Sequence, residues 1–255
     1  MSIADRLVAV AENQQKVYDA GYEKGKSEGG GDNWYDAFWD AYQQNGERKN
    51  YMQAFRGVGW RGTTFKPKHN MTVTNGNYFL YAAGVKTDPI DLIALEESGL
   101  IIDFSQCTTQ MEAAFSQAPS LVTVGTVDLS SFKGTLNSVF STSQNLRRIK
   151  LLKVTEKITL YQTTFANCTA LTEIEFDGVI AASIDFASSP LNKKSIDSIV
   201  EHLSGTASGQ TLTLKKTAVN NAFGINVDDE STFPKGSEYY ALRHSRDNWT
   251  FTYAS

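Results

Sequence analysis

The chain has little cysteine, no long apolar run and no excess of positive charge, and each shortage excludes a class of protein. Two cysteines in 255 residues, Cys107 and Cys168, are too few for a disulfide-stabilised scaffold. No apolar segment approaches the ~18 residues of a membrane span, so we expect no membrane insertion. A net charge of −4 argues against a nucleic-acid partner. The first residues lack the basic and apolar regions of a secretion signal.

Three segments match, or nearly match, the residue pattern of a nucleotide-binding or catalytic motif, but the strands and helices that each motif requires are not expected around them. Residues 57–62 spell G-x-G-x-x-G, but Pro67 prevents a helix from following. Residues 21–27 are one residue short of a P-loop, and residues 25–29 spell G-x-S-x-G before a glycine run rather than a helix. The three histidines have no His or Cys partner at metal-ligand spacing. We therefore expect no enzyme, no catalytic residue, no metal and no cofactor.

The chain does contain an apolar pattern that repeats every 25 residues. In each repeat, an i, i+4, i+7 spacing predicts a short helical turn, and L-x-x-[VI] predicts a strand that pairs in parallel with the next. A small residue in a fixed slot lets neighbouring repeats approach, so Cys168 is expected to be a buried core residue. The matching positions are Met111/Leu136/Tyr161, Phe115/Phe140/Phe165, Ala118/Ser143/Cys168, Leu121/Leu146/Leu171 and Val124/Ile149/Ile174. The predicted fold is mixed α/β, a solenoid of 25-residue repeats over residues 70–188.

Polar residues between the inward strand positions form a possible ligand surface. Parallel stacking is expected to place Arg148 beside Glu173 and Lys150 beside Glu175, one strand apart. These residues are either solubilising ion pairs or a polar stripe that binds a ligand, and mutually paired charges favour the first alternative.

The N-terminal segment, residues 1–28, is expected to be a coiled-coil-like helix. Its seam is formed by Ile3, Leu7, Val10, Gln14 and Val17, with the spacing of heptads that bury a partner helix. The helix either packs on its own domain or associates with copies of itself or with another protein. Three consecutive glycines then predict a hinge over residues 29–33.

Terminal caps are expected on both sides of the repeats. The aromatic-rich residues 34–69 are interpreted as an N-terminal cap, although Trp34 and Trp39 could also form a platform for sugar rings. In the C-terminal α/β cap, residues 189–255, Asn192 is expected to cap a helix, Thr211–Leu214 to form a strand, and a helix near 237–245 to precede a strand at 249–253.

The repeats resemble leucine-rich repeats of the bacterial surface-antigen type, most closely in Phe165-x-x-Cys168-x-x-Leu171-x-x-Ile174-x-Phe176. The opening helix, the glycine hinge and the segments Tyr35–Asp40 and Thr64–Lys68 resemble phage and prophage proteins of Gram-positive bacteria. The resemblance implies a leucine-rich-repeat solenoid in a virion component such as a tail, fibre or baseplate protein.

The function expected from these observations is a non-enzymatic, structural or receptor-binding protein at the virion surface. Its expected partners are other virion proteins and itself through the N-terminal helix, as a trimer by analogy with tail fibres, and a host cell-wall glycan or surface protein. The alternatives are a bacterial leucine-rich-repeat adhesion module, which the missing secretion signal disfavours, and a tail-associated polysaccharide depolymerase, which no motif supports.

Overall fold

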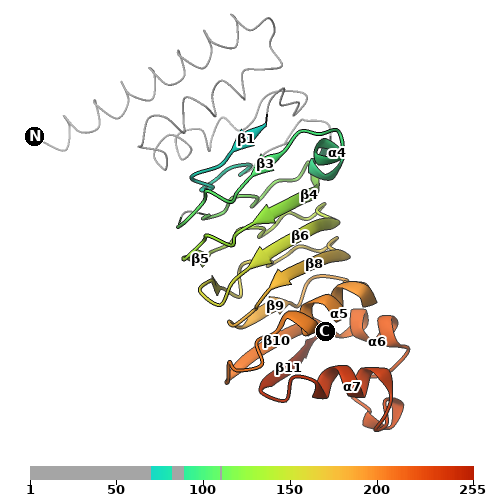
Figure 1. Cartoon of the computed structure of the whole chain (residues 1–255). Helices are drawn as coiled ribbons and strands as arrows, with labels where there is room; N and C mark the ends of the chain where they lie inside the picture. Colours follow the sequence, from blue (N-terminus) through green and yellow to red (C-terminus); the bar gives the residue numbers. More distant parts are fainter. Residues whose placement is uncertain (1–69, 82–88, 110) are drawn as a thin grey trace, which may run out of the picture.

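The structure, a computed structural model, describes residues 70–81, 89–109 and 111–255 as a mixed α/β fold with small, parallel sheets. Figure 1 shows these sheets following one another along the molecule, with most of the helix gathered at the end that holds β11. In chain order the elements are β1 (Met71–Thr72), β2 (Ile90–Asp91), α4 (Leu92–Glu97), β3 (Ile102–Asp103), β4 (Leu121–Asp128), β5 (Thr135–Leu136), β6 (Arg148–Val154), β7 (Thr159–Leu160), β8 (Glu173–Gly178), β9 (Ile184–Phe186), α5 (Lys193–His202), β10 (Gln210–Lys215), α6 (Lys216–Phe223), the 3-10 helix η1 (Glu230–Thr232), α7 (Glu238–His244) and β11 (Trp249–Ala254).

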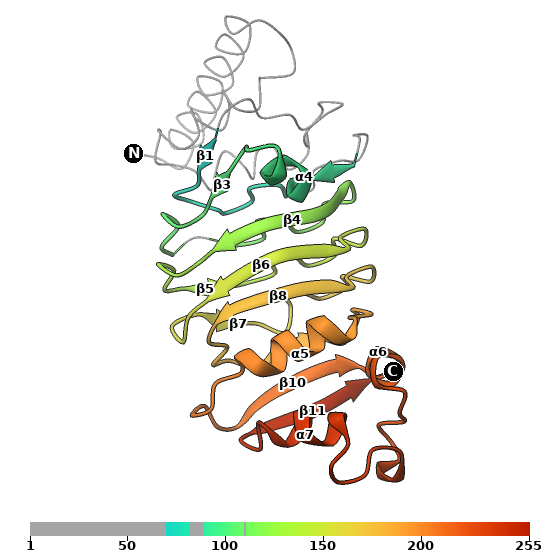
Figure 2. The same ribbon diagram turned by 45° about the vertical axis from the view of Figure 1, so that its right-hand side comes forward.

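The described strands form four sheets in which every pairing is parallel. The largest has the order β2-β4-β6-β8, and a three-stranded sheet has the order β11-β10-β9. The two remaining sheets are the pairs β1-β3 and β5-β7. Figure 2 shows β4, β6 and β8 lying side by side, with α5 next to β8.

Apolar and polar residues alternate along much of the three long strands β4, β6 and β8, and this pattern decides which face of the sheet is buried. Val124, Ile149 and Ile174 lie in register on neighbouring strands and are fully buried. The residues just before them in β6 and β8, Arg148 and Glu173, face solvent, as a period of two requires. The predicted parallel pairing of these strands is confirmed.

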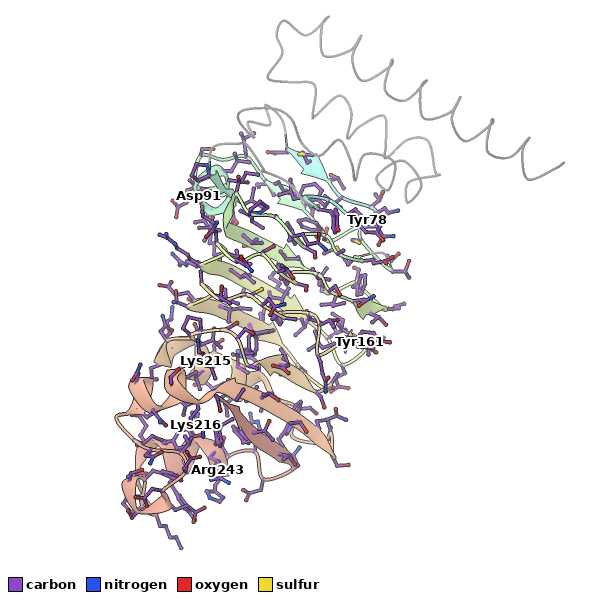
Figure 3. The ribbon with its side chains drawn as sticks, turned by 180° about the vertical axis from the view of Figure 1, so that it is seen from behind. Tyr78, Asp91, Tyr161, Lys215, Lys216 and Arg243 are labelled. Carbon is purple, nitrogen blue, oxygen red and sulfur yellow. The ribbon has the colours of Figure 1, made fainter. Side chains whose placement is uncertain are left out.

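The predicted leucine-rich-repeat solenoid is wrong. The strands divide among four small sheets rather than following one repeated unit, and the segments expected as helical turns contain no helix. The 25-residue spacing also fails between β5 and β7, where Leu136 pairs with Leu160 at a separation of 24 residues. Tyr161, expected in the core, is consequently 52% exposed (Figure 3), and Leu160 is buried in its place.

Left-handed backbone conformations explain the missing helical turns. Gln117, Thr142 and Asn167 have φ of 53°, 61° and 59°, and Ala113 and Ser138 have φ of 51° and 54°. A right-handed helix cannot continue through such residues, so the chain makes tight turns there. The apolar residues of these segments point into the core from successive turns. Their spacing along the sequence is the same as on one face of a short helix, so the pattern alone does not distinguish the two structures.

A column of phenylalanine rings runs through the core. Phe140 lies between Phe115 and Phe165, with ring centroids 5.3 and 5.2 Å away and rings nearly parallel. Phe186 extends the column at 4.6 Å from Phe165. These four side chains are buried, so the column joins the three turn segments that hold Phe115, Phe140 and Phe165 to one another and to strand β9, which holds Phe186.

The small-residue slot also carries hydrogen bonds between neighbouring turns. The Ser143 hydroxyl donates to the carbonyl of Phe115, and the Cys168 thiol donates to the carbonyl of Phe140 at 3.0 Å. Both side chains are fully buried, which confirms the prediction for Cys168. The Phe140 carbonyl also accepts from the Ser143 amide of its own turn at 3.3 Å, so the Cys168 thiol adds a hydrogen bond between neighbouring turns to one that the turn already makes.

The C-terminal elements follow the sequence pattern. Asn192 accepts a hydrogen bond from the Ser195 amide and caps α5, and Ser237 caps α7 in the same way. Strands β10 and β11 lie where alternation predicts them and pair over six residues without a register shift. Trp249 anchors β11 because its indole N–H donates to the carbonyl of Ser204 at 2.9 Å.

The predictions for the N-terminal helix, the glycine hinge and the aromatic segment lie outside the described residues. Within residues 70–81, 89–109 and 111–255, no helix has the length and apolarity needed to cross a membrane.

Candidate functional site

The outer face of the four-stranded sheet carries the charged residues that the sequence pattern singles out. Arg148 of β6 lies directly beside Glu173 of β8, and its guanidinium Nε is 3.2 Å from the Glu173 carboxylate. Both side chains are nearly half exposed, so the pair is worth at most about 1 kcal/mol. The predicted neighbourhood of these two residues is confirmed.

The second predicted pair, Lys150 with Glu175, is wrong. The Lys150 Nζ lies 2.7 Å from Glu96 of α4, and Glu175 forms an ion pair with Lys194 of α5. The register between β6 and β8 shifts between Ile149 and Leu152, at the position where Lys150 would face Glu175. Lys150 therefore pairs with a residue of α4 and Glu175 with a residue of α5, and the two do not pair with each other.

Glu96 is the most highly bonded carboxylate on this face. One of its oxygens accepts from the Thr126 amide at 2.7 Å, and the other accepts from the Thr126 hydroxyl at 3.1 Å and from Lys150 at 2.7 Å. Gly125 makes room for it, because a Cβ at that residue would lie 2.4 Å from a Glu96 oxygen. Burial acts to raise the pKa of Glu96, but the hydrogen bonds from Lys150 and Thr126 outweigh it and hold the pKa below its usual range.

Helix α5 covers the opposite edge of the sheet. The Ser195 hydroxyl accepts from the Ile174 amide at 2.9 Å, and the Ser198 hydroxyl accepts from the Phe176 amide at 3.0 Å. Both amides belong to the outward edge of β8, beside which the described part of the chain places no further strand. Side chains of α5 thus take the place of a neighbouring strand beside β8, and Glu96 of α4 does so beside β4, beyond the two residues of β2.

A small hollow lies between α4 and β4. Its walls are apolar apart from Glu96 and Thr126, and it has room for about one water molecule. The lining residues include Leu92, Leu100 and Phe104. Because the Glu96 carboxylate is already occupied by three hydrogen bonds, the hollow offers a ligand little free polar capacity.

Other ionisable groups with shifted pKa values are held in structural contacts. Burial raises the pKa of the Cys168 thiol to about 12, so it is not a thiolate at neutral pH. The hydroxyls of Tyr239 and Tyr253 share a hydrogen bond, and burial raises the pKa of both. In the described part of the chain, no three His, Cys, Asp or Glu residues lie close enough together to hold a metal ion.

The sites proposed from sequence are only partly placed by the structure. Arg148, Lys150, Glu173 and Glu175 lie on one face, between α4 and α5. The seam residues Ile3, Leu7, Val10, Gln14 and Val17, and the aromatic residues Trp34 and Trp39, lie outside the described residues.

Sequence reasoning missed Glu96, Lys194 and the two serines of α5. Glu96 and Lys150 are 54 residues apart in the sequence, and no local periodicity connects two residues at that separation. Ser195 and Ser198 are three residues apart on a helix that was expected, so their common face was a usable signal.

Comparison with protein-family models, with curated proteins and with solved structures finds no match for this chain.

Proposed function

We propose that this chain is a non-enzymatic phage virion protein, a tail, fibre or baseplate component, exposed at the virion surface. In this role it attaches the virion to the host or forms part of the virion's structure. Its partners are other virion proteins and itself, through residues 1–28, and a host cell-wall glycan or surface protein.

The observation that carries the proposal is the layered parallel sheet with its continuous ring column. The column of Phe115, Phe140, Phe165 and Phe186 joins successive layers, each layer being one strand with the turn segment before it. Charged residues lie on the outer face of strands β6 and β8. A body of this kind holds its loops and faces in fixed positions. Such a support suits attachment, because a binding surface that is already ordered loses less conformational freedom when it binds.

The chemistry of the ionisable groups supports a role other than catalysis. Glu96 is neutralised by Lys150, Glu173 by Arg148, and Asp128 by Lys153 at 3.2 Å. Each of these carboxylates forms an ion pair that joins two strands or a helix and a strand. The Cys168 thiol is protonated and fully buried. A binding surface in this protein therefore draws on the loops at the strand ends, or on the aromatic segment with Trp34 and Trp39.

The experiment is mass spectrometry of gradient-purified virions from the strain that encodes this chain. The proposal predicts that the chain stays with the particles through the gradient in a constant ratio to the major tail proteins. Recovery of the chain only in the cell fraction, with particles that lack it, would refute the proposal.

A further inference from the structure

Strand β11 forms an edge of the three-stranded sheet, and this edge differs from those of the four-stranded sheet. In the four-stranded sheet, Ser195 and Ser198 of α5 accept hydrogen bonds from outward amides of the edge strand β8. Glu96 of α4 accepts from the Thr126 amide of β4, beyond the end of the short strand β2. In the three-stranded sheet, β11 pairs with β10 on one side. Among the described residues, no element pairs with its other side.

The sequence of β11 carries none of the usual devices that keep an edge strand single. Its residues, Trp-Thr-Phe-Thr-Tyr-Ala, include no charge, no proline and no glycine, and all have the side chains of good strand formers except the last. Its register with β10 runs from Trp249 to Ala254 without a bulge. Thr250 and Thr252 are exposed, so the strand offers six residues of neutral edge without a bulge.

The two faces of the strand differ in chemistry. Trp249, Phe251 and Tyr253 are in register with Gln210, Leu212 and Leu214 of β10 and point to the core side. Thr250 and Thr252 point to the other side, where the Thr252 hydroxyl lies 2.9 Å from that of Thr213.

Residues 249–253 are symmetric in chemical class about Phe251. Aromatic and threonine residues alternate, so the order is the same in both directions along the strand. In an antiparallel pair related by a two-fold axis through Phe251, Thr250 lies opposite the partner's Thr252 and Trp249 lies opposite the partner's Tyr253. Such a pair keeps threonine beside threonine on one face and aromatic beside aromatic on the other, and both kinds of cross-strand pair are favourable.

From this symmetry we propose that the free edge of β11 pairs with β11 of a second copy of this chain. The pairing is antiparallel, is centred on Phe251, and joins two three-stranded sheets into one of six strands. The occupant is a second copy because the edge is neutral and self-complementary, and so contains no charge that would select a differently charged partner. The surface is separate from the predicted seam in residues 1–28, so it adds a second contact between copies.

The test uses the full chain and two double variants whose outcomes depend on the register. In Thr250→Lys/Thr252→Lys, every cross-strand threonine pair becomes a pair of like charges. In Thr250→Lys/Thr252→Glu, the same two sites become pairs of opposite charge. All these changes are at exposed side chains, and circular dichroism during urea unfolding checks that each variant folds.

Light scattering over a range of chain concentrations then measures the mass of each protein. We expect the Lys/Lys variant to have a lower mass than the wild type at high concentration, because it loses the β11 contact, and the Lys/Glu variant to keep the wild-type mass. Hydrogen exchange of the β11 amides is expected to slow with concentration in the wild type and not in the Lys/Lys variant. Equal masses for wild type and the Lys/Lys variant at every concentration, or loss of mass in the Lys/Glu variant as well, would overturn the proposal.

Discussion

Phe140→Ala tests whether the ring column holds the layers together. Phe140 is fully buried, and both faces of its ring are covered, by Phe115 at 5.3 Å and by Phe165 at 5.2 Å. Truncation removes the apolar contact and leaves a cavity between two layers that cannot close without moving strands. We therefore expect a loss of about 3–5 kcal/mol in the free energy of unfolding.

Two control variants separate the stacking from the general effect of removing a ring. Phe140→Leu keeps most of the apolar volume and loses the ring contacts, so we expect a smaller loss of about 1–2 kcal/mol. Tyr161→Ala removes a ring that is 52% exposed, and should change stability by no more than about 0.5 kcal/mol.

The assay is urea unfolding followed by far-ultraviolet circular dichroism, with the free energy extrapolated to zero denaturant. A loss below about 1 kcal/mol for Phe140→Ala, which is the size of a surface effect, would show that the column does not join the layers.

The other predictions concern a turn, a carboxylate, a helix cap and the aromatic segment. Gly178→Ala should lower the free energy of unfolding in urea by about 2–4 kcal/mol, because φ at Gly178 is 91° and a Cβ there would lie 2.0 Å from the carbonyl oxygen of Val154. Gly205→Ala is the control and should be close to neutral, because no atom lies within 4 Å of the added Cβ. Because the folded-state pKa of Glu96 is lowered from 4.5, its stabilisation is present above that value and is lost as pH falls through the folded pKa, so Glu96→Gln should flatten the acid side of a stability–pH curve; an unchanged curve would contradict this. Asn192→Ala should cost about 1 kcal/mol by removing the cap of α5, measured by thermal unfolding against Asn192→Ser, which keeps a cap. Trp39→Ala should weaken binding of the full chain to host cell walls in a sedimentation assay, with folding checked; retention of full binding would move the contact elsewhere.

Local chemistry explains which parts of the fold could be predicted from the sequence. Alternation identified β6, β8, β10 and β11, and the cap residue Asn192 identified the start of α5. These elements depend on neighbouring residues only, so their signals are contained in short windows of sequence.

The errors came from features that only the packed chain determines. The segment before Phe140 has the spacing of a helix, but the left-handed φ of Ser138 makes it a turn. The one-residue contraction between Leu136 and Leu160 moves Tyr161 to the surface. The pairing of Lys150 with Glu96 depends on a helix 54 residues away, so the expected partner on the next strand was wrong.

The central claim, that this chain is exposed on the virion, is tested most directly by electron microscopy with a gold-labelled antibody. The antibody is raised against the purified full chain and applied to intact particles, with particles from a strain lacking the gene as the control. The proposal predicts gold on the outside of intact virions at one repeated position, and none on the control particles. Gold that appears only after the particles are disrupted, or only on the bacterial surface, would contradict it.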